Sequence, residues 1–139
     1  MRQLNRAAQR GVGLIEGLVA IAVLGFGVLG LARFQADVFR QSTDAQNRLM
    51  AAGFADTLLA YVRVDAANAA CYTWPQTGAC GSSAASTLAA DWAAGAAASG
   101  FDDVSATLAT PSQLTARLAW SSHAFKEVRS LEATTDVRP

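Results

Sequence analysis

The sequence predicts an α+β protein in which a long N-terminal α-helix packs on a small antiparallel β-sheet. Three observations support this prediction. Residues 12–64 have helical patterning without a proline, and segments that alternate between apolar and polar residues follow only after residue 100. Two cysteines, Cys71 and Cys80, lie between these regions. A chain of 139 residues has room for one small domain in addition to the helix.

The first part of the helix has the composition of a membrane span. Residues 1–11 are basic and contain no acid, and residues 14–32 are apolar except for Glu16. As a helix, the apolar run is about 28 Å long, close to the thickness of one hydrocarbon core. The positive-inside rule keeps the N-terminus in the cytoplasm and exports the remainder. The alternative is a secretory signal peptide, which has a shorter apolar core followed by a small-residue cleavage site.

Glu16 is the residue of this span that needs an explanation. An isolated carboxylate in a membrane-spanning helix costs about 2.5–3.5 kcal/mol on insertion scales. It could stay hydrated at the membrane interface. If the chain is cut after Gly11, however, the new amino group of Val12 lies one helical turn away and can pair with Glu16 of the same or a neighbouring chain. Pairing between chains would reject misaligned neighbours, because an unpaired charge is costly in a low-dielectric environment.

The stretch GVGLIE at residues 11–16 resembles the processing motif of the type IV pilin family. The resemblance implies that a prepilin peptidase cuts between Gly11 and Val12 and N-methylates Val12, and that Glu16 helps to dock the subunit into a filament. Val12 and Gly13 stand where phenylalanine and threonine are commonest in the family. Over residues 10–65 the chain is also similar to PilV-type minor pilins, the type IV pilus modification proteins. The minor pseudopilins of type II secretion share this N-terminus.

The chain is expected to have four parts. They are a cleaved basic leader (1–11), a transmembrane or filament-core helix (12–33), its amphipathic continuation (34–64) and a small periplasmic globular domain (65–139). Several glycines lie inside the helix, where each costs about 1 kcal/mol relative to alanine. Gly13 and Gly17 are spaced as a small-residue pair that allows two helices to approach closely. Membrane helices also tolerate glycines that have no such role.

The amphipathic continuation has two faces. On one face, charges of alternating sign are expected to form a solvated stripe, with contact to adjacent subunits as the alternative. The other face is apolar, and its C-terminal half is expected to pack on the globular domain. The stripe contains Arg33, Asp37, Arg40, Asp44 and Arg48, and the apolar face contains Phe34, Val38, Ala45, Leu49, Phe54, Leu58 and Tyr61 or Val62.

The globular domain is expected to hold a disulfide, a short helix and three strands. In an exported domain Cys71 and Cys80 are expected to form a disulfide that closes a small ring. The alanine-rich residues 82–99 are predicted to be a helix with Ser83 as its N-cap and with Leu88 and Trp92 buried, or else a loosely ordered loop. Residues 103–109, 113–121 and 128–137 are predicted to form an antiparallel meander.

Several classes of function are disfavoured. The sequence contains no catalytic constellation, no cofactor is expected, and no metal site is expected because His123 is far from both cysteines. Without its leader the chain keeps eight basic and eleven acidic residues, which disfavours nucleic-acid binding and a DNA-uptake pilin. The three tryptophans are expected to lie in the core, although an exposed Trp74 could contact a partner.

The expected function is that of a minor pilin, a structural subunit and not an enzyme, which helps to initiate or cap a type IV pilus and could have an adhesive role. Its partners would be other major and minor pilins, prepilin peptidase, the inner-membrane pilus assembly machinery and, before assembly, membrane lipid. It would lie in the inner membrane with its C-terminal domain in the periplasm, and in the extracellular pilus after assembly. The alternatives are a type II secretion minor pseudopilin and an uncleaved bitopic periplasmic scaffold or receptor.

Overall fold

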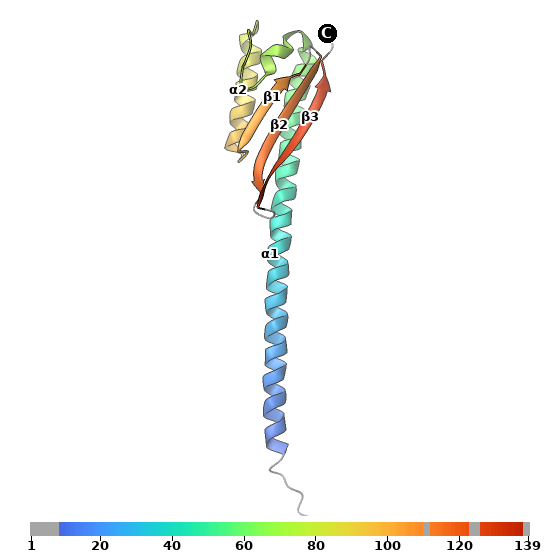
Figure 1. The fold of residues 1–139 in the computed structure, drawn as a ribbon, viewed down its shortest axis with the longest axis vertical. Helices are drawn as coiled ribbons and strands as arrows, with labels where there is room; N and C mark the ends of the chain where they lie inside the picture. The colour runs from blue at the N-terminus through green and yellow to red at the C-terminus, as the bar shows by residue number, and fades with distance from the viewer. Residues whose placement is uncertain (1–8, 110–111, 123–125, 138–139) are drawn as a thin grey trace, which may run out of the picture. The chain divides into compact units, whose positions relative to one another are not determined.

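The computed structural model describes residues 9–109, 112–122 and 126–137, with side chains from residue 13 onward. The chain divides after Arg40 into two compact units, the second of which begins at Gln41. In chain order the elements are α1 (Gln9–Val64), the 3₁₀ helix η1 (Ala66–Tyr72), α2 (Ser83–Ala98), β1 (Asp103–Leu108), β2 (Gln113–Ser122) and β3 (Glu127–Asp136) (Figure 1).

The expected α+β fold is confirmed, with the pilin-like arrangement of a long N-terminal helix on a small antiparallel sheet. α1 ends at Val64, as the sequence predicts, and Asp65 organises the exit from the helix. The Asp65 backbone N–H donates to the Tyr61 carbonyl (3.0 Å). The Asp65 carboxylate accepts bonds from Asn68 Nδ2 (2.8 Å) and the Tyr72 hydroxyl (3.3 Å), and these bonds hold η1 against the end of α1.

The three strands form a meander in the order β1-β2-β3, with both ladders antiparallel. Each strand lies within one residue of its expected bounds. This agreement reflects the clean alternation of β2, in which Leu114, Ala116, Leu118 and Trp120 are buried. Beyond the outer edge of β1, Trp74 forms one isolated antiparallel bridge with Ala106.

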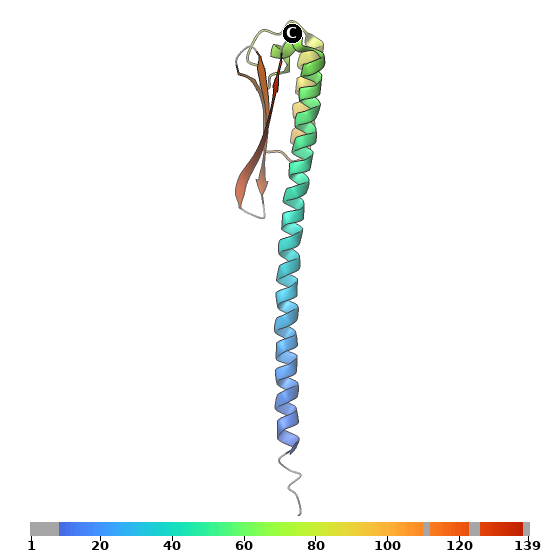
Figure 2. The same ribbon diagram turned by 90° about the vertical axis from the view of Figure 1, so that its right-hand side faces the viewer.

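The core of the second unit lies between two layers. The sheet forms one layer, and residues 41–64 of α1 together with α2 form the other (Figure 2). The Trp92 indole N–H donates to the Phe54 carbonyl on α1 (2.8 Å). The rings of Phe54, Phe101 and Trp120 meet edge to face, with centroids 5.9 and 6.1 Å apart. The buried apolar residues of α1 are Ala51, Ala55, Leu58, Leu59 and Val62.

The predicted helix over the alanine-rich segment is confirmed as α2, but two details of the prediction are wrong. The N-cap is Ser82 instead of Ser83, since the Ser82 hydroxyl accepts the Ala85 N–H (3.3 Å). Leu88 is 38% exposed, whereas a stripe of small residues is buried with Trp92. Small side chains allow α2 to lie close to α1, and a Cβ at Gly95 would be 3.6 Å from the Phe54 ring. The buried small residues are Ala85, Ala89, Ala93 and Ala96.

The Cys71–Cys80 disulfide is confirmed, with the two Cα atoms 4.9 Å apart. It joins the end of η1 to the chain just before α2. The loop that it closes contains a cis peptide bond between Trp74 and Pro75. The disulfide therefore ties the segment that passes the edge of β1 to the segment that starts α2.

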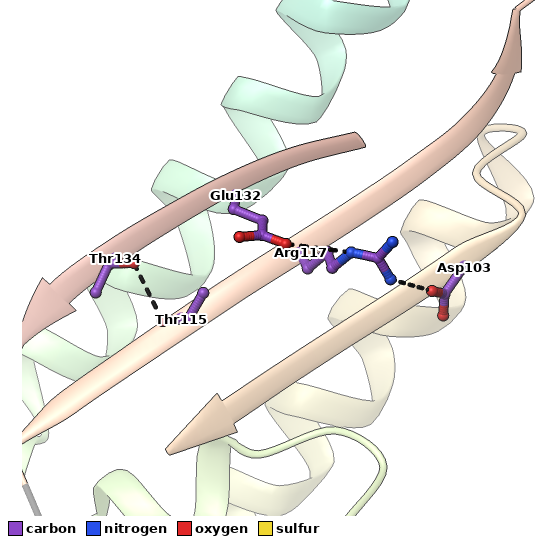
Figure 3. A network of polar contacts seen from close by, with 5 residues as sticks. All are labelled: Asp103, Thr115, Arg117, Glu132 and Thr134. Carbon is purple, nitrogen blue, oxygen red and sulfur yellow. Dashed lines mark hydrogen bonds and ion pairs between the residues drawn. The ribbon is translucent and has the colours of Figure 1, made fainter. Parts of the chain in front are cut away.

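The outer face of the sheet is polar and is joined across all three strands (Figure 3). The Arg117 guanidinium on β2 lies 2.6 Å from Asp103 on β1 and 3.3 Å from Glu132 on β3. The hydroxyls of Thr115 and Thr134 are 3.1 Å apart. Exposed ion pairs of this kind contribute only about 0.2–1 kcal/mol each, so the buried face holds most of the sheet's stability.

Candidate functional site

The candidate functional site is the part of α1 that belongs to the first unit. From Gly13 to Arg40 every side chain of this helix is exposed. No residue of its apolar window is buried, and within the described residues it is the one helix long and apolar enough to cross a membrane. An apolar surface of this extent needs a cover of lipid or of other apolar helices. The coarse localisation, a helix fit for membrane anchoring, is thus supported.

Glu16 lies near the start of this surface, with a cylinder of apolar side chains after it. Its own side chain is exposed, and no ion pair or hydrogen bond of Glu16 is found within the described residues. Gly11 and Val12 belong to the first turns of α1, so their backbone is helical, but their side chains lie outside the described ones. The cut between them stays a prediction, and the leader residues 1–8 lie outside the described part.

Gly13 and Gly17 lie one turn apart on the exposed helix. A Cβ built on either residue would meet no atom within 4 Å, and the same holds for Gly25, Gly27 and Gly30. Packing within the described chain therefore does not require glycine at these positions. Any requirement for close approach at Gly13 and Gly17 must come from another molecule, as the predicted role in helix packing implies.

The predicted solvated stripe is correct for its first part and wrong at Asp44. Asp37 and Arg40 are exposed, with Oδ1 and Nη1 3.8 Å apart. Asp44 is only 7% exposed, and it is the one buried charged residue in the described part of the chain. Its carboxylate accepts a bond from Trp120 Nε1 (3.2 Å) and lies 3.3 Å from Arg48 Nε. At Asp44 the stripe therefore passes from solvent into contact with Trp120 on β2.

The predicted apolar face of the amphipathic part is wrong near residues 45–55, where a neighbouring row of side chains is buried instead. Ala45 is exposed and Leu49 is 74% exposed, whereas Ala51 and Ala55 are fully buried. Leu58 and Val62 are buried as expected. The buried face thus runs from Asp44 through Ala51 and Ala55. Bulky side chains would hold the sheet away from α1 here, whereas alanines permit contact.

The pKa of Asp44 reflects a balance of opposing effects. Burial of the carboxyl group raises the pKa, but the hydrogen bond from Trp120, the nearby Ser122 hydroxyl and the positive charges of Arg129 and Arg48 together lower it more. The net result is a pKa below the ordinary value for aspartate, so Asp44 is ionised at neutral pH. At the other end of the sheet, Arg63 Nε donates to the Thr135 hydroxyl (3.0 Å), which gives α1 a second polar tie.

A comparison with protein-family models, curated proteins and solved structures found no match. The function of this chain is therefore argued from its own residues and geometry. The structure brings together Cys71 with Cys80, and it leaves Glu16, Gly13 and Gly17 exposed on one helix. Sequence reasoning missed Asp44 as an anchor. One signal pointed to it, the need of a buried tryptophan for a hydrogen-bond acceptor.

Proposed function

We propose that this chain is a minor pilin, made as a membrane-anchored precursor and incorporated into a type IV pilus by lateral packing of its apolar helix. In this proposal a prepilin peptidase cuts between Gly11 and Val12, and Glu16 docks the subunit against its neighbours. The observation that carries the proposal is Glu16 itself, the one charge between residues 11 and 32, in a part of α1 (residues 13–40) whose side chains are all exposed.

The physical argument starts from the cost of that charge. A carboxylate at membrane depth costs about 2.5–3.5 kcal/mol, and no partner for it lies within the described residues. A free amino group at Val12, one helical turn away, would offset this cost. If the amine belongs to a neighbouring subunit, the pair also selects one register between two apolar helices that would otherwise slide.

The second unit supports the same proposal because it would lie outside the membrane. It has its own core and carries a disulfide, which is typical of exported domains. A small domain on an apolar helix suits a subunit that initiates or caps a filament. The same features would also serve a type II secretion pseudopilin, and the filament with which the protein co-purifies separates the two.

Mass spectrometry of the N-terminus tests the processing step. We expect a species that begins at methylated Val12. Replacing Gly11 with alanine is expected to leave the leader in place, because the cut depends on that position. An intact Met1 in the unmodified protein from its native host would contradict the proposal and would support a bitopic scaffold or receptor.

Replacing Glu16 tests the docking step. Glu16→Gln keeps the size of the side chain and removes its charge, and Asp37→Asn is the matched control on the exposed stripe. We expect Glu16→Gln to be processed but recovered in sheared filaments at least about tenfold less, and Asp37→Asn to be recovered normally. Normal filament recovery of Glu16→Gln would eliminate the docking role.

A further inference from the structure

A groove on the second unit lies between the disulfide loop and β1. The groove has a volume of about 430 Å³, which is within the usual range for small-ligand sites. The described residues that line it include Trp74 and the hydroxyl residues Thr77, Ser105 and Thr107, and none of the lining residues is ionisable. A different groove, beside the β2–β3 hairpin, is lined by Arg48, Glu127 and Arg129 and is therefore charged.

Trp74 differs from the other two tryptophans of the chain. The indole N–H groups of Trp92 and Trp120 both donate to protein acceptors, and both side chains are buried. Trp74 is half-buried, and its indole N–H has no acceptor among the described residues. Tryptophans with one apolar face in the protein and a polar edge in water are typical of binding surfaces. Trp74 therefore offers a ring and a free donor to a ligand.

The hydroxyl groups around Trp74 are available in the same way. No protein partner for the hydroxyls of Thr77, Ser105 or Thr107 is found in the described part of the chain, and each can donate as well as accept. The groove thus combines an aromatic ring with several neutral hydrogen-bonding groups. None of the lining residues would offer an opposite charge to a charged ligand that loses its hydration there, which is unfavourable for such a ligand.

The groove is also rigid before any ligand binds. The backbone N–H of Trp74 donates to the Ala106 carbonyl (2.8 Å), and the backbone N–H of Ala106 donates to the Trp74 carbonyl (2.7 Å). The Thr73 hydroxyl donates to the Ala70 carbonyl (3.0 Å), and the disulfide closes the loop. A wall fixed in this way loses little conformational entropy on binding. The bridge also occupies the edge of β1 at Ala106, where an added peptide strand would need to pair.

We propose that this groove binds a neutral saccharide. A sugar ring has hydroxyls that donate and accept, which match the threonine and serine hydroxyls and the indole N–H. It also has an apolar face of C–H groups that can lie on the Trp74 ring. This inference goes beyond the assembly function and does not depend on it, since it uses none of the residues around Glu16.

The test uses the full chain in micelles of a detergent without a sugar headgroup, with ¹⁵N-labelled tryptophan. The probes are lactose, cellobiose, maltose and diacetylchitobiose, each at up to about tens of millimolar, and sialyllactose as an acidic counterpart. We expect at least one neutral sugar to shift the indole N–H signal of Trp74 and to leave the signals of Trp92 and Trp120 in place.

Two variants and one control assign the binding to the groove. Trp74→Ala is expected to weaken binding at least about tenfold, and Thr107→Val, which keeps its shape, by about threefold to tenfold. Thr134→Val, on the outer face of the sheet, should bind as the unmodified chain does. If Trp74→Ala fails to fold, Thr107→Val and the Trp74 signal of the unmodified chain decide the matter.

The proposal is overturned if no neutral sugar moves the Trp74 signal, if only the acidic sugar binds, or if Thr107→Val binds normally. Binding of an extended peptide in place of sugars would also overturn it. Each of these results leaves the N-terminal processing of the chain unaffected, so failure here is distinguishable from failure of the pilin proposal.

Discussion

The two parts of α1, before and after Arg40, both carry apolar side chains, but these side chains are covered differently. In the first part Leu24 is 70% exposed, whereas in the second part Leu58 is fully buried against the sheet and α2. The second part finds its apolar partners within the same chain. The first part has none within the described residues, so any cover for its apolar side chains must come from lipid or from apolar surfaces of other molecules. Whether a leucine on this helix is buried within the chain therefore depends on what lies beside it.

A matched pair of leucine substitutions should give the largest difference between the two parts. Leu58→Ala is expected to reduce the free energy of unfolding of the second unit by about 2–5 kcal/mol, because it leaves a cavity in the core. Leu24→Ala should change that free energy by less than about 0.5 kcal/mol. Denaturant unfolding of the full chain in micelles, followed by near-ultraviolet circular dichroism, measures both. Equal effects would mean that the first part also packs within the chain.

Removal of the disulfide is expected to have a somewhat smaller effect, confined to the second unit. Replacing both Cys71 and Cys80 with serine should reduce the free energy of unfolding by about 2.5–3 kcal/mol, the chain-entropy value for a loop of this size. Reduction of the unmodified chain with a thiol provides the matched comparison. An unchanged unfolding midpoint after both treatments would contradict the assigned role of the bridge in holding the loop and α2.

The smallest expected difference is between substitutions of Asp44 and of Asp37, two aspartates on the same charged stripe. Asp44→Asn should reduce the free energy of unfolding by about 1–2 kcal/mol. This is less than the loss expected from breaking a fully buried ion pair, because Arg48 is half exposed. Asp37→Asn should leave the free energy of unfolding almost unchanged, because Asp37 and Arg40 are both exposed.

The pH dependence of unfolding distinguishes the two aspartates further. The pKa of Asp44 is lower in the folded chain, so its contribution is present above the pKa of unfolded aspartate and is lost as pH falls through the lowered value. As the pH falls into the acid range, the free energy of unfolding of Asp44→Asn should therefore decrease less than that of the unmodified chain. The free energy of unfolding of Asp37→Asn should decrease as much as that of the unmodified chain. Identical acid profiles of the two variants would show that Asp44 is not the anchor.

Local patterns were sufficient to predict much of the second unit. The end of α1 at Val64, the bounds of the strands and the Cys71–Cys80 pairing all follow from residues close together in the chain. The face of α1 that is buried was harder to predict, because periodicity alone does not choose between two adjacent rows of a helix. Alanines looked too small to form a core face, yet their size is what permits the layers to touch.

By itself, the sequence determined the apolar helix, its one acidic residue, the alternation of the strands and the spacing of the cysteines, since each is a property of neighbouring residues. Only the tertiary structure decided that Asp44 is buried and Leu49 exposed. The reason is that Trp120, which lies 76 residues further along the chain, supplies the hydrogen bond that makes a buried carboxylate acceptable. Contacts between residues so far apart depend on how the sheet lies against the helix, and no local pattern encodes that placement.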